Sequence, residues 1–115
     1  MKPAQVVLAL AALAQDTRLA AFRLLVEAGK PGLAAGAIAA RLGLPAPTAS
    51  FHLAQLARAG LVKSRTEGRF VIYSVDLARM NGVLTYLTDN CCGGAACEVM
   101  PKAASPRRTA ARSGP

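Results

Sequence analysis

The stretch AIAARLGLPAPTASFHLAQLARAGLV, residues 37–62, decides the fold. A short helical segment ends at Gly43, and Leu44-Pro45-Ala46 separates it from a second segment whose Pro47 suits a first helical turn. In the second segment, Ala and Leu recur at positions 49, 53, 56 and 57, which is helical spacing, until Gly60 ends the helix. Two short helices joined by so tight a turn predict a helix-turn-helix.

The flanking sequence predicts three more helices and a hairpin. Residues 4–14 form an apolar helix, and a second helix, capped by Asp16 or Thr17, ends at 29–32. Leu19, Phe22, Leu25 and Val26 share its apolar side, with Arg18, Arg23 and Glu27 opposite. Further helices are expected over 35–42, 48–60 and 77–87, with a β-hairpin over 61–75 that turns at 66–68. The predicted order is α-α-α-α-β-β-α, a mainly α (α+β) winged helix-turn-helix.

The second helix of this motif carries the candidate DNA-reading residues, because its N-terminal part enters the major groove. Removing the inward positions leaves six side chains facing out: Thr48, Ser50, Phe51, His52, Gln55 and Arg58. The hairpin adds the cations Lys63, Arg65 and Arg69, which suit backbone phosphate. Taken alone, His52 is an ordinary polar residue and the cations are a solvated face. An exposed Phe51 beside them favours a contact surface.

Length and charge set the broad class. A chain of 115 residues suggests one domain, and a net charge of +8 favours a polyanionic partner, with nucleic acid ahead of an anionic membrane. Half of that charge lies in residues 101–115, a Pro-, Ala- and Ser-rich segment that we expect to be disordered. It either adds non-specific DNA attraction or is an inert solvated end. The apolar N-terminal run is too short to span a bilayer, and we expect a cytoplasmic protein.

All three cysteines fall in TDNCCGGAACEVM, residues 88–100, as Cys91, Cys92 and Cys97. They are odd in number and too close for a disulfide framework, which fits a reducing compartment. Thiolates prefer soft ions, and trivalent arsenic or antimony takes three sulfurs where zinc prefers four ligands. Adjacent cysteines converge only if the preceding helix has ended, and Asn90 and Gly93-Gly94 supply that ending. We therefore expect three parts: a winged helix-turn-helix domain for DNA binding and dimerisation over 1–90, a cysteine-bearing inducer segment over 91–100 and a disordered basic tail over 101–115.

The runs DTRLAAFRLLVEAG (16–29) and AIAARLGLPAPTASFHLAQLARAGLVKSRTEGRFVIYS (37–74) resemble the ArsR/SmtB family of metal-sensing repressors. The resemblance covers roughly residues 5–90. It implies a homodimer through the first and last helices, operator DNA as partner and release by a metal or metalloid. Apolar positions of those helices suit the dimer contact, with part of each helix packing within its own chain: Val7, Leu10, Leu13, Met80, Leu84 and Leu87.

The sequence departs from the family at its known inducer sites. Residues 32–36 hold no thiol where the founding arsenic sensors carry a cysteine pair. The last helix holds no histidine, so the zinc site of the family cannot be built there. Some arsenic-responsive members carry a C-terminal cysteine cluster, which the resemblance matches to Cys91, Cys92 and Cys97.

The expected function is a metalloid-responsive repressor that leaves DNA when thiolates bind As(III) or Sb(III). Three alternatives stay open: a thiol-based redox sensor, a sensor of a methylated arsenical that needs only two thiols, and a DNA-binding scaffold that ignores metals. An enzyme such as an arsenate reductase is not expected. The sequence shows no C-x-x-C arrangement, Gly-rich phosphate loop or nucleophile-base set.

Overall fold

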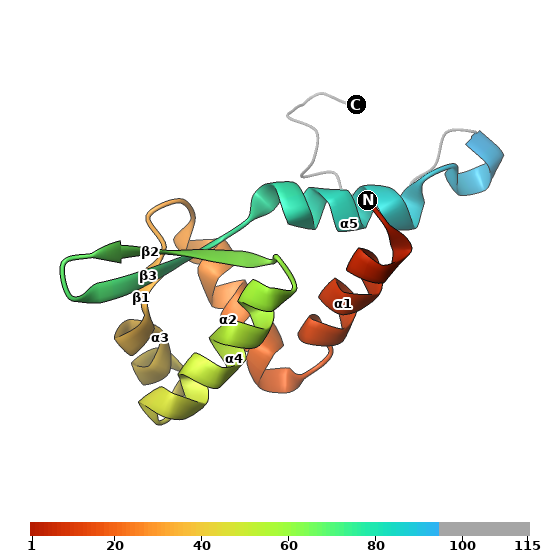
Figure 1. Ribbon diagram of the computed structural model, residues 1–115. Helices are drawn as coiled ribbons and strands as arrows, with labels where there is room; N and C mark the ends of the chain where they lie inside the picture. The colour runs from red at the N-terminus through yellow and green to blue at the C-terminus, as the bar shows by residue number, and fades with distance from the viewer. Residues whose placement is uncertain (95–115) are drawn as a thin grey trace, which may run out of the picture. The chain divides into compact units, whose positions relative to one another are not determined.

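The computed structural model describes residues 1–94 and contains, within them, five α-helices, a three-stranded sheet and a final 3₁₀ turn (Figure 1). The elements are α1 (Pro3–Leu13), α2 (Asp16–Ala28), β1 (Leu33–Ala34), α3 (Ala35–Leu42), α4 (Ala46–Arg58), β2 (Val62–Glu67), β3 (Phe70–Val75), α5 (Leu77–Thr88) and η1 (Cys91–Gly94). The predicted winged helix-turn-helix and its order are confirmed, with β1 as an added strand. Predictions for Cys97 and for residues 101–115 fall outside the described residues.

The start of α2 corrects one prediction. Its N-cap is Gln15, whose side-chain oxygen accepts a hydrogen bond from the backbone N–H of Arg18, and not Asp16 or Thr17. Asp16 instead lies in the first turn, where a carboxylate suits the positive end of the helix dipole. The chain therefore enters α2 one residue earlier than the cap signal suggested.

The core forms where α2, α3 and α4 meet. Its largest fully buried side chains are Leu25, Ile38, Leu53, Leu56 and Leu61. In α4, Ala49, Leu53 and Leu56 are buried as predicted, but Ala57 is exposed and Ala59 is buried in its place. A step of three residues from Leu56 keeps Ala59 on the inner face of the chain, whereas Ala57 lies about 100° away around the helix.

Only part of the apolar stripe of α2 is covered. Phe22 and Leu25 are buried, as is Ala21, but Leu19 and Val26 are exposed. Leu19 and Val26 of the predicted apolar side are thus not covered within the single chain. The inner face of α2 packs against the core, and the two large aliphatic side chains Leu19 and Val26 remain exposed to solvent.

The sheet has the order β1-β3-β2, with both pairs antiparallel. Strands β2 and β3 form the predicted hairpin, from Val62 opposite Val75 to Glu67 opposite Phe70, so the turn is Gly68-Arg69 and not 66–68. Strand β1 pairs Leu33 with Tyr73 and Ala34 with Ile72, so that it adds a third strand at the free edge of β3. It has two residues, too few to show an alternating pattern.

Two compact units divide the chain, and the division lies inside α5: Met1–Val83 form the first, and the second begins at Leu84. The helix-turn-helix, the hairpin and α1 all belong to the first unit. The cysteine-bearing turn belongs to the second. Over residues 1–94 no helix combines the length and hydrophobicity that crossing a bilayer requires.

Candidate nucleic-acid interface and thiol pair

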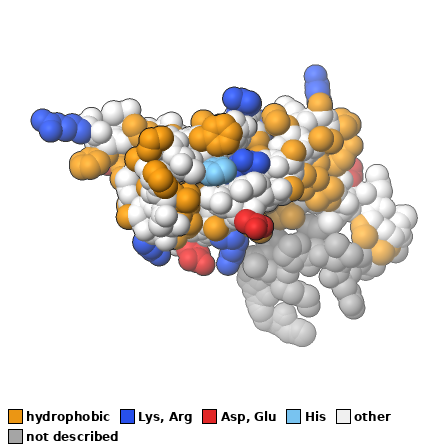
Figure 2. Space-filling view, turned by 90° about the horizontal axis from the view of Figure 1, so that it is seen from below, with side chains coloured by type: hydrophobic (Ala, Val, Ile, Leu, Met, Phe, Trp, Pro, Cys, Tyr) orange, Lys and Arg blue, Asp and Glu red, His pale blue; other side chains and the backbone are white. Residues whose placement is uncertain are grey.

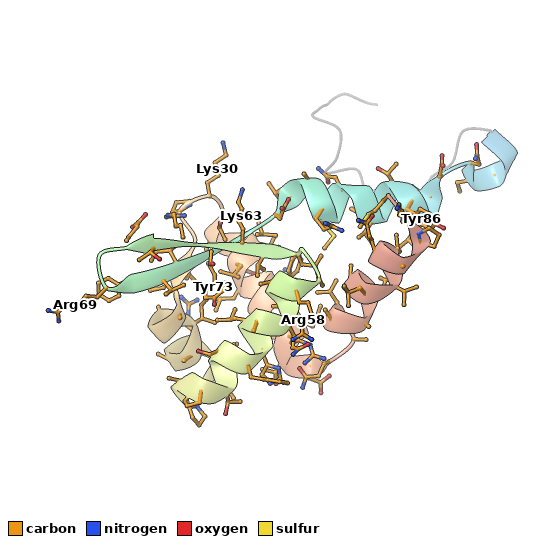
Figure 3. All side chains as sticks on the ribbon, viewed as in Figure 1. Lys30, Arg58, Lys63, Arg69, Tyr73 and Tyr86 are labelled. Atoms are coloured by element: carbon orange, nitrogen blue, oxygen red, sulfur yellow. The ribbon has the colours of Figure 1, made fainter. Side chains whose placement is uncertain are left out.

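The outward face of α4 carries a polar surface with one aromatic side chain in it. Thr48, Ser50, Phe51 and Arg58 are exposed, and Gln55 is half-buried. Phe51 is 57% exposed to solvent, although large aromatic side chains are usually buried. Arg58 lies at the C-terminal end of the helix (Figure 3). The N-terminal two turns of α4 thus present hydroxyl groups and an uncovered ring to a partner.

His52 differs from these neighbours because it is half-buried and has contacts within the chain. Its Nδ1 lies 3.3 Å from Nη1 of Arg18, and its ring meets that of Phe51 edge to face at a centroid distance of 5.4 Å. In Figure 2 the histidine reaches the surface among hydrophobic and basic side chains. The ring is therefore fixed from one side and accessible from another.

Arg18 makes contacts with the site that the sequence reasoning missed. We predicted it on the solvent side of α2, but it is half-buried. Its Nε donates to the carbonyl oxygen of Ala12 at 2.7 Å, and Nη1 faces His52. Because helical periodicity gives only the direction of a side chain, no signal in the sequence distinguished Arg18 from the exposed Arg23.

The hairpin does not use its three cations alike. Arg69 is exposed at the turn, and Figure 3 shows it pointing away from the body of the protein. Arg65 donates to the carbonyl oxygen of Pro31 at 2.8 Å and to Oε2 of Glu67 at 2.6 Å. Arg65 thus ties the hairpin to the loop after α2, while Arg69 lies at the tip, where it can reach a partner.

Lys63 lies with Lys30, which the sequence analysis did not single out. Both are exposed and line one groove of about 440 Å³ together with Arg65 and the start of α5. Figure 3 shows both lysines extending away from α4. The basic charge of the hairpin therefore lies in two places, with Arg69 at the tip and Lys63 on the side of the sheet away from α4.

The thiols of Cys91 and Cys92 converge just beyond α5. That helix ends at Thr88, and Asn90 and Cys92 take left-handed backbone angles, with φ of 59° and 58°. This turn brings the two Sγ atoms within 3.5 Å, well beyond the ~2 Å of a disulfide bond. Cys92 is exposed and Cys91 is half-buried. The predicted convergence after the end of the helix is confirmed for this pair.

No group of three or more His, Cys, Asp or Glu side chains suited to a metal occurs within residues 1–94. The pair alone supplies two sulfurs. A third sulfur from Cys97 stays a prediction, because Cys97 lies outside the described residues.

The first and last helices each leave apolar side chains in solvent. On α1, Val6, Ala9 and Ala12 are buried, while Val7 is 65% exposed and Leu8 and Leu10 are also exposed. On α5, Leu87 is 55% exposed and Leu84 is half-buried. Leu13 and Met80 pack against the core of their own chain, so part of each helix is used internally, as expected.

The fold and this surface define a winged helix-turn-helix protein of the DNA-binding type. Residues 13–65 match the family model of the helix-turn-helix domain. Over 64 residues the chain is 31% identical to the HTH-type transcriptional regulator YgaV of Escherichia coli (strain K12). That match covers 56% of this chain and 65% of the relative, slightly less than two thirds of its length.

Three solved structures are similar over most of the chain. An ArsR-like transcriptional regulator from Rhodococcus sp. RHA1 is 30% identical with a TM-score of 0.65, covering 73% of this chain and 76% of that one. The homodimeric winged helix-turn-helix domain Mb0332 from Mycobacterium bovis, a possible ArsR-family regulator, is 32% identical with a TM-score of 0.60, covering 82% and 87%. A possible transcriptional regulator for arsenical resistance is 28% identical with a TM-score of 0.55, covering 75% and 94%. The chain belongs to the ArsR family of transcriptional regulators.

Proposed function

We propose that the chain is a homodimeric repressor that leaves its operator when trivalent arsenic or antimony binds Cys91, Cys92 and Cys97. The observation that carries the proposal is the 3.5 Å distance between the first two sulfurs. Two thiols so close and partly exposed supply two of the three sulfurs that soft trivalent ions prefer. The similarity to a possible regulator for arsenical resistance supports the same inducer class.

The operator contact rests on α4 and the hairpin tip. Thr48 and Ser50 can bond phosphates or bases, Gln55 suits adenine, and Phe51 suits a thymine methyl group. Arg69 supplies a cation for backbone phosphate at the tip of the hairpin. Lys63 and Arg65 make the weaker case for direct contact, since one lies toward the remote side of the sheet and the other has protein partners.

The homodimer rests on apolar surface that the single chain leaves open. Burying exposed valine and leucine side chains against a partner is favourable, with a free energy of ~25 cal/mol for each Å² of apolar surface removed from water. Val7 and Leu10 on α1 and Leu87 on α5 provide such surface. The homodimeric domain from Mycobacterium bovis, of the same fold and 32% identical, supports this assembly. A dimer would present two copies of α4 to two half-sites of one operator.

Release follows from the position of the thiols in the chain. Two residues separate Cys91 from the end of α5, the helix that we assign to the dimer contact. An ion that gathers their sulfurs restrains the end of that helix and so favours one arrangement of the dimer. If this arrangement misfits the two half-sites, DNA affinity falls by the coupling free energy, typically ~1–3 kcal/mol.

The test is Cys91→Ser in the full chain. We expect operator affinity close to wild type, because the thiol is remote in sequence from α4, and loss of release by arsenite, because one ligand is gone. Fluorescence anisotropy on operator DNA with and without As(III) measures both. Thr85→Ser, at an exposed position of α5, is the control and should still release. A Cys91→Ser protein that leaves DNA normally on arsenite addition would show that the inducer site lies elsewhere.

The same titration separates the alternatives. Release by phenylarsine oxide in a Cys97→Ser protein would indicate a two-thiol site for organic arsenicals. Release by peroxide and not by arsenite would indicate a redox sensor, because Cys97 could then pair with Cys91 or Cys92. Operator binding that ignores all of these reagents would indicate a DNA-binding protein without a metalloid inducer.

A further inference from the structure

The contact between Arg18 and His52 determines which nitrogen of the His52 ring can donate a hydrogen bond. A guanidinium group has donors only, so the 3.3 Å approach of Nη1 to Nδ1 is a hydrogen bond in which the imidazole nitrogen accepts. A nitrogen that accepts carries no proton. The neutral ring must then hold its proton on Nε2, at the other edge.

We propose that Arg18 is a positioning residue for DNA recognition: it holds His52 as the Nε2–H tautomer and turns that donor toward the operator. The inference rests on the proposed function for its DNA part, while its tautomer part concerns the protein alone. Hydrogen-bond acceptors in the major groove are the N7 and O6 atoms of guanine, N7 of adenine and O4 of thymine. A fixed Nε2–H donor suits any of these or a phosphate oxygen, and it disfavours the exocyclic amine of cytosine.

Arg18 is itself held in place, which makes it a suitable support. Its Nε bonds the carbonyl oxygen of Ala12 at 2.7 Å, in the last turn of α1, where helix carbonyls lack an intrahelical partner. Its backbone N–H bonds Gln15 at 2.8 Å. Arg18, through its side chain and its backbone N–H, therefore joins the end of α1, the start of α2 and the helix α4.

Phe51 completes the support of the ring. Its edge-to-face contact at 5.4 Å, with an interplanar angle of 70°, restrains the tilt of the imidazole. With Nδ1 bonded to Arg18, a 180° flip of the ring would put the carbon Cδ2 in the place of Nδ1 and break this hydrogen bond. His52 is half-buried and its Nδ1 is bonded to Arg18, which leaves Nε2 as the ring nitrogen that can bond the partner.

The first measurement is ring ¹⁵N NMR of the full chain, which is simple because His52 is the only histidine. We expect the Nε2–H tautomer in the wild type and a changed Nδ1 shift in Arg18→Gln. The control is Arg23→Gln, which removes the same charge from an exposed position of α2 and should leave the spectrum unchanged. An Nδ1 shift that Arg18→Gln does not alter would overturn the proposal, whatever the protein does with DNA.

The second measurement is operator affinity. A glutamine amide reaches about as far as Nε2, and an asparagine amide about as far as Nδ1. His52→Gln should therefore stay within about threefold of wild type, and His52→Asn should lose about tenfold, the value of one hydrogen bond. The opposite ranking would show that Nε2 is not the operator contact. Either variant keeps a polar side chain on the surface, so folding is not at stake.

A double-mutant cycle decides whether Arg18 acts through His52. Arg18→Gln should weaken operator binding about tenfold in the wild type and less than threefold in a His52→Ala background. Equal losses in the two backgrounds would mean that Arg18 acts as a structural or phosphate-binding residue, and would overturn the proposal. Absence of operator binding by the wild-type protein would refute the proposed function, while the NMR result would still decide the tautomer.

Discussion

Single residues with the same backbone angle have different roles in this fold. Gly32 and Gly43 both have left-handed φ, at 70° and 68°. Gly43 ends α3 in open space, with nothing within 4 Å of where a Cβ would lie, whereas at Gly32 that atom would collide with the carbonyl oxygen of Tyr73. Gly32 is thus needed for the close pairing of β1 with β3, and Gly43 for its angle alone.

This difference predicts unequal costs for the same substitution. Gly43→Ala should lower the free energy of unfolding by about 1–2 kcal/mol, the cost of a left-handed L-residue. Gly32→Ala adds the displacement of a backbone oxygen, about 1–3 kcal/mol more. Chemical denaturation measured by circular dichroism compares the two. Equal midpoints would mean that β1 yields to the added methyl group.

At the scale of elements, the hairpin divides its cations between anchoring and reach. Two hydrogen bonds occupy Arg65, so that this residue sets the position of the hairpin relative to the loop after α2. Arg69 is in the two-residue turn and is exposed. The sequence puts both in one basic run, and only the register of the strands separates their roles.

Arg69→Ala should weaken binding to operator and to unrelated DNA alike, because a phosphate contact carries no sequence information. The slope of log affinity against log salt should fall by about 1. Titrations at several salt concentrations measure it, with Arg23→Ala as the control of equal charge on α2. If both variants lower the slope equally, Arg69 makes no direct phosphate contact and acts only through its charge.

The helix-turn-helix shows how far element prediction can go. Gly43 marks the end of α3 and Pro47 the start of α4, because the backbone preferences of glycine and proline do not depend on the surrounding fold. Both helices therefore lie close to their predicted positions. Gln15 as cap of α2 could not be foreseen, because its oxygen accepts a bond only in the geometry that the helix adopts. Ala59 is different, because its three-residue step from Leu56 already places it on the inner face of the helix.

At the scale of the whole molecule, the proposed dimer covers the exposed apolar side chains of α1. Val7→Glu would place a charge in the dimer contact that we propose, and burying an unpaired charge is costly. We expect it to shift the protein toward the monomer in sedimentation experiments and to weaken operator binding, since one α4 reads only one half-site. Val71→Glu, the same change at an exposed hairpin position, should stay dimeric. A dimeric Val7→Glu protein would place the contact elsewhere.

The sequence by itself determined the order of the elements, the reading helix and the convergence of Cys91 with Cys92. These depend on local rules: helical spacing, the backbone limits of proline and glycine, and the end of a helix before adjacent thiols. Only the tertiary structure decided that Arg18 holds His52, that Arg65 is an anchor and that Gly32 must lack a side chain. Each of these depends on a contact between segments distant in sequence, and periodicity within one segment cannot specify such a contact.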